Sequence, residues 1–146
     1  MNSYSFKTIF GWITIKSLNS KLVSVKFGKT KNLRSNKYLL YVSKQIKLYS
    51  LGKLKKFNLD YNLLGTPLQI KIWKELSKIE YSQTKSYGEI AKKIKTSPRY
   101  VGNVCGQNNL IIPCHRVIKS DGSLGGFSGL GGIKLKKKLL NLEVNV

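Results

Sequence analysis

Three helix-start signals follow one another in the second half of the chain, and they constrain its fold more than any other feature. Residues 66–69 (Thr-Pro-Leu-Gln) and 86–89 (Ser-Tyr-Gly-Glu) each form a capping box, and Ser97-Pro98 places a hydroxyl before a proline at a first helical position. Only Lys95-Thr96 separates the second predicted helix from the third. Two short helices joined by a tight turn have the outline of a helix-turn-helix.

The first half has a different pattern, which is typical of strands. Residues 4–9, 11–16 and 21–27 are short runs rich in β-branched and aromatic side chains, separated by turn residues. An imperfect apolar stripe over residues 37–49 predicts a helix, and residues 57–59 could add a short strand. Nothing in this half carries chemistry, so we interpret it as a scaffold.

These patterns together predict an α+β protein with two domains. We expect a small N-terminal sheet-plus-helix domain at residues 1–60 and a helical C-terminal domain at residues 61–146 with a winged helix-turn-helix.

The charge of the chain indicates its partner. Lysine and arginine total 27 against 6 acidic residues, for a formal net charge of +21. Such an excess attracts polyanions, of which nucleic acid is the most common. Only 3 of the basic residues are arginine, so a lysine-rich proteome could also produce this bias. Charge alone does not distinguish DNA, RNA or an anionic membrane.

Few residues are available for metal or disulfide chemistry. The chain has two cysteines, Cys105 and Cys114, and the single histidine His115. Two cysteines in a basic protein without a secretion signal are more often thiols than a disulfide, and three such residues with two adjacent are a poor zinc site. We therefore expect no metal and no cofactor.

The chain shows no feature of a membrane or secreted protein. No apolar run approaches the roughly 20 residues that span a bilayer, and the N-terminus lacks a charged segment followed by an apolar one. We expect a cytoplasmic protein that does not bind membranes.

The strongest candidate for chemistry is Pro113-Cys114-His115-Arg116, which lies between two apolar runs. A proline turns the chain there, and a neighbouring histidine can favour the reactive thiolate. Adjacency alone does not bring His115 to the sulfur, because consecutive residues of an extended chain point to opposite faces. A buried structural cysteine beside a hydrogen-bonded histidine is the alternative.

This segment, with Val117, resembles the active-site signature of the O6-alkylguanine-DNA alkyltransferases, also called methylated-DNA–protein-cysteine methyltransferases. The resemblance covers nearly all of residues 65–143 in family order, whereas the first half resembles the family only in strand-rich character and length. Its further matching segments are residues 65–67, Trp73, 86–88, 97–102, 122–128 and 139–143.

The resemblance implies a set of catalytic roles. Cys114 would accept the alkyl group. His115 would ionise the Cys114 thiol through a water, and Glu143 would orient His115. Tyr87 would give its phenolic proton to the leaving guanine, and Asn108 would brace the active-site turn as the hinge asparagine. The run between residue 108 and Pro113 is about two residues shorter than usual, which leaves Asn108 or Asn109 as the hinge. Arg116 is expected to make structural hydrogen bonds.

It also implies how substrate is held. Arg99, early in the second helix of the helix-turn-helix, would fill the space left by a flipped-out base, and Gly102 would allow close contact with the groove. Ser97, Tyr100 and Thr66 are further expected DNA contacts. The base pocket would be lined by Val117, Phe127, Ser128 and Gly129. Phe127 stands where the family often has tyrosine, so a hydroxyl contact is lost there.

The implied function is DNA repair by irreversible, single-turnover alkyl transfer. The substrate is O6-alkylguanine, and less readily O4-alkylthymine, in double-stranded DNA, and the protein acts as a monomer in the cytoplasm of a prokaryotic cell, on the nucleoid when engaged. Two alternatives remain: a module that senses damaged bases without reacting, and a plain helix-turn-helix regulator in which Cys114 is part of the core.

Overall fold

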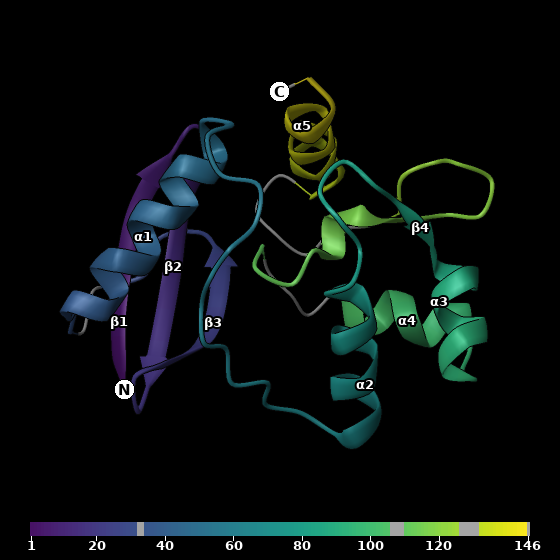
Figure 1. The fold of residues 1–146 in the computed structure, drawn as a ribbon, viewed down its shortest axis with the longest axis horizontal. Coiled ribbons are helices and arrows are strands. Elements are labelled where there is room, and N and C mark those ends of the chain that lie inside the picture. Colours follow the sequence, from purple (N-terminus) through teal and green to yellow (C-terminus); the bar gives the residue numbers. More distant parts are fainter. Residues whose placement is uncertain (32–33, 106–109, 126–131, 146) are drawn as a thin grey trace. The chain divides into compact units, whose positions relative to one another are not determined.

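The computed structural model describes residues 1–31, 34–105, 110–125 and 132–145 of the chain. The chain divides into two compact units, Met1–Leu64 and Gly65–Asn145 (Figure 1). The predicted boundary lay after residue 60. No helix in these described ranges has the length and apolar character that a membrane crossing requires.

The N-terminal unit is an antiparallel sheet covered by one helix. Its strands are β1 (Asn2–Thr8), β2 (Gly11–Leu18) and β3 (Lys21–Phe27), in the order β1-β2-β3. The hairpin between β2 and β3 turns at Asn19 and Ser20, which have φ of 51° and 62°. Two consecutive residues with positive φ make a tight turn whose twist matches the flanking strands.

Helix α1 (Lys37–Ser50) begins at Asn36, whose side chain accepts a hydrogen bond from the Leu39 amide (2.9 Å). It packs on β1 and β2 of the sheet. The strand residues that alternate onto one face meet the apolar stripe of α1 and form the core of this unit. The fully buried core side chains are those of Ile13, Ile15, Leu22, Val25, Leu39, Val42, Ile46 and Tyr49.

The prediction of a short strand at residues 57–59 is wrong. The Asn58 amide donates to the side chain of Gln45 on α1 (3.2 Å) instead of to a neighbouring strand. The chain pairs with β3 just after this segment, at an isolated bridge between Leu22 and Tyr61, where Leu22 N–H donates to the Asp60 carbonyl (2.9 Å). A side chain of α1 has therefore taken the backbone bond that a strand would need.

The C-terminal unit is mainly helical. Its described elements are α2 (Pro67–Leu76), β4 (Lys85–Ser86), α3 (Tyr87–Ile94), α4 (Pro98–Cys105), the 3-10 turn η1 (Cys114–Arg116), β5 (Val117–Ile118) and α5 (Gly132–Asn145). Strands β4 and β5 pair in parallel, with Lys85 opposite Val117 and Ser86 opposite Ile118. This two-residue pairing joins the start of α3 to the segment that follows Cys114.

The helix starts lie where the capping signals predict them. The Thr66 hydroxyl accepts from the Gln69 backbone amide (3.2 Å), and the Gln69 side-chain oxygen accepts from the Thr66 backbone amide (2.9 Å). Ser86 and Glu89 make the same reciprocal pair. Lys95, at φ 66°, ends α3 in the left-handed conformation that turns the chain towards α4. The α+β fold class, with a small N-terminal sheet and helix before a helical unit, is confirmed.

Candidate active site

The backbone turns sharply just before Cys114. Pro113 has φ −77° and ψ 63°, and Cys114 N–H donates to the Ile112 carbonyl two residues back (2.7 Å), which is an inverse γ-turn. The chain then continues as η1. Cys114 is 1% exposed, so its thiol lies inside the unit and not on its surface.

His115 contacts Glu143, which is 28 residues further along the chain on α5. The distance from His115 Nε2 to Glu143 Oε2 is 2.6 Å, and both side chains are buried. Burial lowers the pKa of His115, while the hydrogen bond and charge of Glu143 oppose this shift. The neutral imidazole donates from Nε2 to the carboxylate, which leaves Nδ1 as its basic nitrogen.

Arg116 holds the same carboxylate in a fixed orientation. Its Nε donates to Glu143 Oε1 (2.8 Å), its Nη2 to Oε2 (2.9 Å) and its Nη1 to the Ile79 carbonyl (2.7 Å). The Ser82 amide also donates to Glu143 Oε1 (3.1 Å). A buried carboxylate needs such compensation, and these bonds anchor α5 to the loop after α2.

A second cluster joins Tyr87 to a buried lysine. Lys136 Nζ donates to the Tyr87 hydroxyl (3.1 Å) and to the Val117 carbonyl (2.6 Å), and Lys136 is 0% exposed. Burial, followed by the charges of Cys105 and Cys114, raises the pKa of Tyr87 to about 12. Tyr87 is therefore a phenol at neutral pH. Burial lowers the pKa of Lys136, and the charges of Cys105 and Cys114 oppose this shift.

Sequence reasoning missed Lys136. It lies within the basic run of residues 134–138, where a solvated face is the ordinary interpretation. Lys136, Leu139 and Glu143 are spaced at i, i+3 and i+7, which places the lysine on the buried face of α5. That spacing was the signal available in the sequence.

Gly125 was also missed, and it packs directly against Tyr87. A Cβ atom at Gly125 would lie 2.6 Å from Cε2 and 2.8 Å from Cζ of the Tyr87 ring. Any side chain here would displace the ring. Gly125 and Lys136 thus determine where the Tyr87 hydroxyl lies.

The predicted DNA-binding residues fall mainly on α4. Ser97 accepts from the Tyr100 amide (3.1 Å) as a helix cap, Arg99 is exposed and Tyr100 is half-buried. A Cβ at Gly102 would lie 3.9 Å from the Tyr87 ring, an ordinary contact, so internal packing does not require glycine there. Thr66 lies apart, at the start of α2, and its hydroxyl is used in the capping box.

Several predicted site residues lie outside the described residues. These are Asn108, Phe127, Ser128 and Gly129, together with the alternative hinge Asn109. Val117, the remaining predicted pocket residue, is 0% exposed and follows η1 directly.

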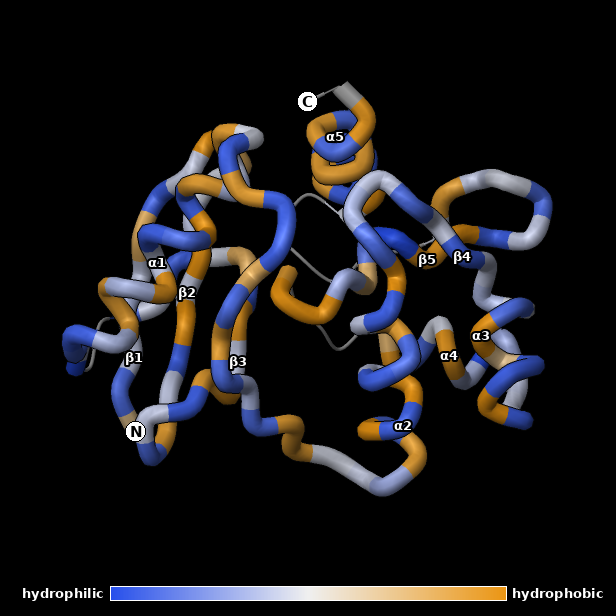
Figure 2. Tube along the Cα trace, viewed as in Figure 1, coloured by the Kyte–Doolittle hydropathy of each residue, from blue (hydrophilic) through white to orange (hydrophobic). Residues whose placement is uncertain are grey.

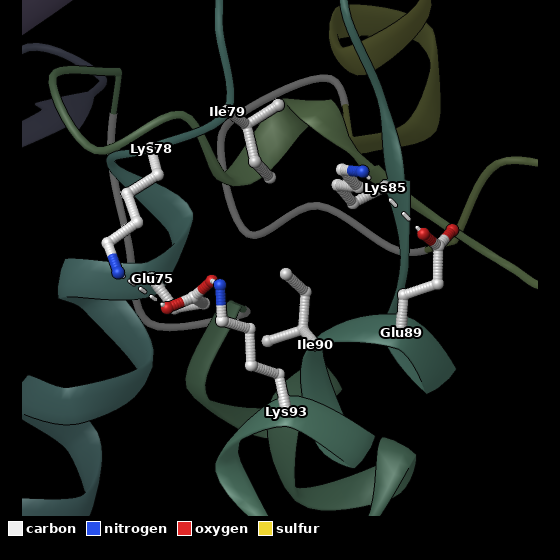
Figure 3. A pocket seen from close by; sticks show the side chains of 7 residues that line it. All are labelled: Glu75, Lys78, Ile79, Lys85, Glu89, Ile90 and Lys93. Carbon is white, nitrogen blue, oxygen red and sulfur yellow. Dashed lines mark hydrogen bonds and ion pairs between the residues drawn. The ribbon is translucent and has the colours of Figure 1, made fainter.

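A hollow of about 240 Å³ opens between α2, β4 and α3, and none of the predicted site residues lines it (Figure 3). Glu75 bonds to Lys78 (3.2 Å) and Lys93 (2.9 Å) on one side, and Lys85 and Glu89 are 3.8 Å apart on the other. The ion pair with Lys93 lowers the pKa of Glu75. The charged side chains that line the hollow are paired with one another, and no nucleophilic side chain lines it. Among the described residues, no three histidine, cysteine, aspartate or glutamate side chains are grouped to hold a metal ion.

Comparison with known proteins identifies the family of the chain. The family model described as 6-O-methylguanine DNA methyltransferase, DNA binding domain, matches residues 67–145. The methylated-DNA–protein-cysteine methyltransferase of Mycobacterium tuberculosis is 44% identical over 103 residues, which are 68% of this chain and 61% of that protein. The chain therefore matches about three fifths of that relative's length.

Other relatives match over almost the whole chain. The protein of the same name from Metallosphaera sedula is 35% identical over 144 residues, covering 95% of this chain and 90% of that protein. The crystal structure of Mycobacterium tuberculosis OGT in complex with DNA has a TM-score of 0.88 at 32% identity, and covers 99% of this chain and 94% of that one. As the resemblance of its active-site signature predicted, the chain belongs to the 6-O-methylguanine DNA methyltransferase family.

Proposed function

We propose that this protein repairs DNA by transferring the alkyl group of O6-alkylguanine to the sulfur of Cys114. The observation that carries this proposal is the combination, in one unit, of a buried cysteine, the buried His115–Glu143 pair and the part-buried Tyr87–Lys136 pair. The His115–Glu143 pair supplies a base, and the Tyr87–Lys136 pair supplies an acid. A cysteine that served only as a core residue would need neither.

Activation begins with the proton of the Cys114 thiol. A water between the thiol and the imidazole passes this proton to Nδ1 of His115, because Nε2 is committed to Glu143. Glu143 stabilises the imidazolium that forms, and Arg116 keeps the carboxylate in place. The result is a thiolate beside a buried, preorganised cation.

In the transfer step the sulfur attacks the alkyl carbon in line with the C–O bond. A carbon–sulfur bond forms, the bond from the alkyl carbon to O6 breaks, and its electron pair goes to the guanine. Tyr87 donates its proton to the leaving guanine, so that no free base anion is released. The ammonium of Lys136, at 3.1 Å, then stabilises the tyrosinate.

The thioether on Cys114 is the end of the reaction. Neither base nor acid in this site can cleave a carbon–sulfur bond by hydrolysis, because a thioether has no carbonyl for water to attack. Each protein molecule therefore acts once, without a cofactor or metal. The related O4-alkylthymine would be a poorer substrate of the same site.

The substrate is held by the α3–α4 helix-turn-helix. The alkylated base must leave the duplex to reach a cysteine that is 1% exposed. Arg99, exposed in the first turn of α4, would fill the vacated space, and Gly102 would let the helix approach the groove. The Mycobacterium tuberculosis structure in complex with DNA supports DNA as the partner. The protein would act as a monomer in the prokaryotic cytoplasm, on the nucleoid.

Intact-mass spectrometry tests this proposal. The protein is incubated with a duplex that contains a single O6-methylguanine, and with the matched unmodified duplex. Wild type and Cys105→Ala should each gain the mass of one methyl group and saturate at one per molecule, whereas Cys114→Ala should gain none. Cys105 is the matched control because it is also a buried cysteine of the same unit.

Absence of any mass gain in wild type that is folded and binds the duplex would overturn the transfer proposal. The protein would then be a module that senses damaged bases. A gain that persists in Cys114→Ala would move the acceptor to another residue.

A further inference from the structure

The N-terminal unit, in which we expect no catalytic residue, has a higher net charge than the larger C-terminal unit. Residues 1–64 contain 13 lysine and arginine residues and one acid, Asp60, for a net charge of +12. Residues 65–146, which hold the helix-turn-helix and Cys114, contain 14 basic and 5 acidic residues, for a net charge of +9. A scaffold that only supported the catalytic unit would not need this excess, which costs self-repulsion.

The lysines of the N-terminal sheet gather on one of its faces. Helix α1 covers the face that bears Phe6, since Lys47 of α1 lies over that ring at 5.7 Å. Residues directly opposite one another in an antiparallel pair share a face, and every second residue returns to it. Trp12 is opposite Lys7, and Thr14 is opposite Lys26. These residues, with Lys16 two positions after Thr14, therefore lie on the face away from α1.

The segment after β3 adds a further lysine to this face. Thr14 donates to the Gly28 carbonyl (2.8 Å), which ties the segment to the sheet. Lys29 Nζ then lies 4.4 Å from the centre of the Trp12 ring, a cation–π contact that holds this ammonium in place. Lys7, Lys26 and Lys29 are exposed and Lys16 is half-buried.

Within the described part of this unit, no ion pair joins a carboxylate to these lysines. Asp60, the single acidic residue of the unit, bonds through its carbonyl to the Leu22 amide near the start of β3, whereas Lys26 and Lys29 lie at and beyond its end. Figure 2 shows hydrophilic and hydrophobic residues alternating along β2, the central strand. The alternation thus produces one apolar face for α1 and one basic face.

We propose that the basic sheet face, formed by Lys7, Trp12, Lys16, Lys26 and Lys29, binds the phosphate backbone of duplex DNA without reading its sequence. Four ammonium groups that make no ion pair within the described part of the unit complement a polyanion, and an ammonium contacts phosphate as a point charge that carries no base specificity. The N-terminal unit is then a second DNA-binding surface, and it does not depend on the chemistry of Cys114. It would hold the protein on undamaged DNA while lesions are found.

Lysine footprinting by mass spectrometry tests the contact between this face and DNA in the wild-type protein. The chain is acetylated with and without a saturating undamaged duplex at low salt, and the modification of each lysine is compared. Lys7, Lys16, Lys26 and Lys29 should be protected, whereas Lys53, Lys55 and Lys56 beyond α1 should not. Equal modification of the first group with and without DNA would overturn the proposal.

The salt dependence of binding gives a second, quantitative test. Two variants each lose four charges: Lys7, Lys16, Lys26 and Lys29 all to Gln, or Lys44, Lys53, Lys55 and Lys56 all to Gln. The first should lower the slope of log affinity against log salt by up to about 3.6, at about 0.9 for each phosphate contact, and the second should leave it near the wild-type value. Equal slopes in the two variants would mean that only overall charge matters.

Two further results distinguish this proposal from the proposed alkyl transfer and from a membrane-binding surface. Methyl transfer from the free nucleoside O6-methyldeoxyguanosine should be unchanged in the variant that lacks the four lysines of the basic sheet face. A failure of transfer in wild type would therefore count against the proposed function alone. Protection of the same lysines by phosphatidylserine vesicles, with none by DNA, would overturn the DNA surface in favour of a membrane one.

Discussion

Tyr87 is held from two sides, by an ammonium and by a glycine. Lys136 donates to its hydroxyl at 3.1 Å, and Gly125 leaves no room for a Cβ beside its ring. A proton donor must lie within hydrogen-bond distance of the atom it protonates, so small displacements of this ring matter to the chemistry. Neither contact is between residues close in sequence.

At Gly125 we expect a single methyl group to impair transfer. In Gly125→Ala the new Cβ would be 2.6 Å from the Tyr87 ring, so the ring must move. The rate of methyl transfer from the free nucleoside, followed by intact mass, should fall by about 10- to 100-fold. Gly102→Ala is the matched control, because its Cβ meets the other side of the same ring at an ordinary 3.9 Å. If both variants react at the wild-type rate, the position of the ring does not limit transfer.

The sequence predicted some residues of the site and missed others, for a physical reason. The resemblance placed Cys114, His115 and Glu143 together, and the 2.6 Å contact between His115 and Glu143 agrees with that expectation. The catalytic roles of these residues remain predictions. The spacing of Lys136 from Leu139 and Glu143 indicated which face of α5 it shares, but not that it is buried, because burial of a charged group depends on partners that only the folded chain supplies.

Among the elements, the short strand β4 connects stability to the site. Ser86 ends β4, pairs with Ile118 and caps α3, so that Tyr87 begins the helix directly after it. Ser86 therefore contributes both to the helix cap and to the strand pairing, and it directly precedes Tyr87, the proposed proton donor.

We expect removal of the Ser86 cap to affect both stability and rate. Ser86→Ala and Thr66→Ala each lose a capping box and should lower the free energy of unfolding by about 1 kcal/mol, measured with urea. Only Ser86→Ala should also slow transfer from the free nucleoside, because only this cap adjoins Tyr87. Equal transfer rates in the two variants would show that the cap does not position the acid.

Helices were predicted better than strands because the capping signals that start a helix lie within a few consecutive residues. A capping box needs four consecutive residues, so the starts of α2 and α3 could be read from the sequence. The strand expected at residues 57–59 failed because the Asn58 amide is bonded by Gln45 of α1. Strands β4 and β5 have two residues each, which is too short for a strand pattern to be recognised in the sequence.

For the whole molecule, burial of the single histidine makes stability depend on pH. His115 is 1% exposed, and burial lowers its pKa below 6.5. Between the lowered pKa and 6.5 the unfolded chain binds a proton that the folded chain does not. Stability is therefore fully present above this window and is lost as the pH falls through it.

Urea unfolding at a series of pH values between about 5 and 8 measures this effect. The free energy of unfolding should fall with decreasing pH by at most about 1.4 kcal/mol per pH unit, the limit for one proton. His115→Gln should be less stable but should lack this slope, since no other side chain ordinarily titrates in that range. A slope that survives in the variant would assign the dependence to another group.

The sequence by itself determined the α+β class, the starts of α2 and α3, the strands of the first half, and the family. These rest on periodicity, capping and a signature of adjacent residues, all of which are local. Only the tertiary structure decided that Lys136 is buried against Tyr87, that Gly125 closes on the same ring, and that four lysines share one face of the sheet with Trp12. Each of these depends on distant segments meeting in the fold, and the desolvation and register that result are not encoded in any short stretch of chain.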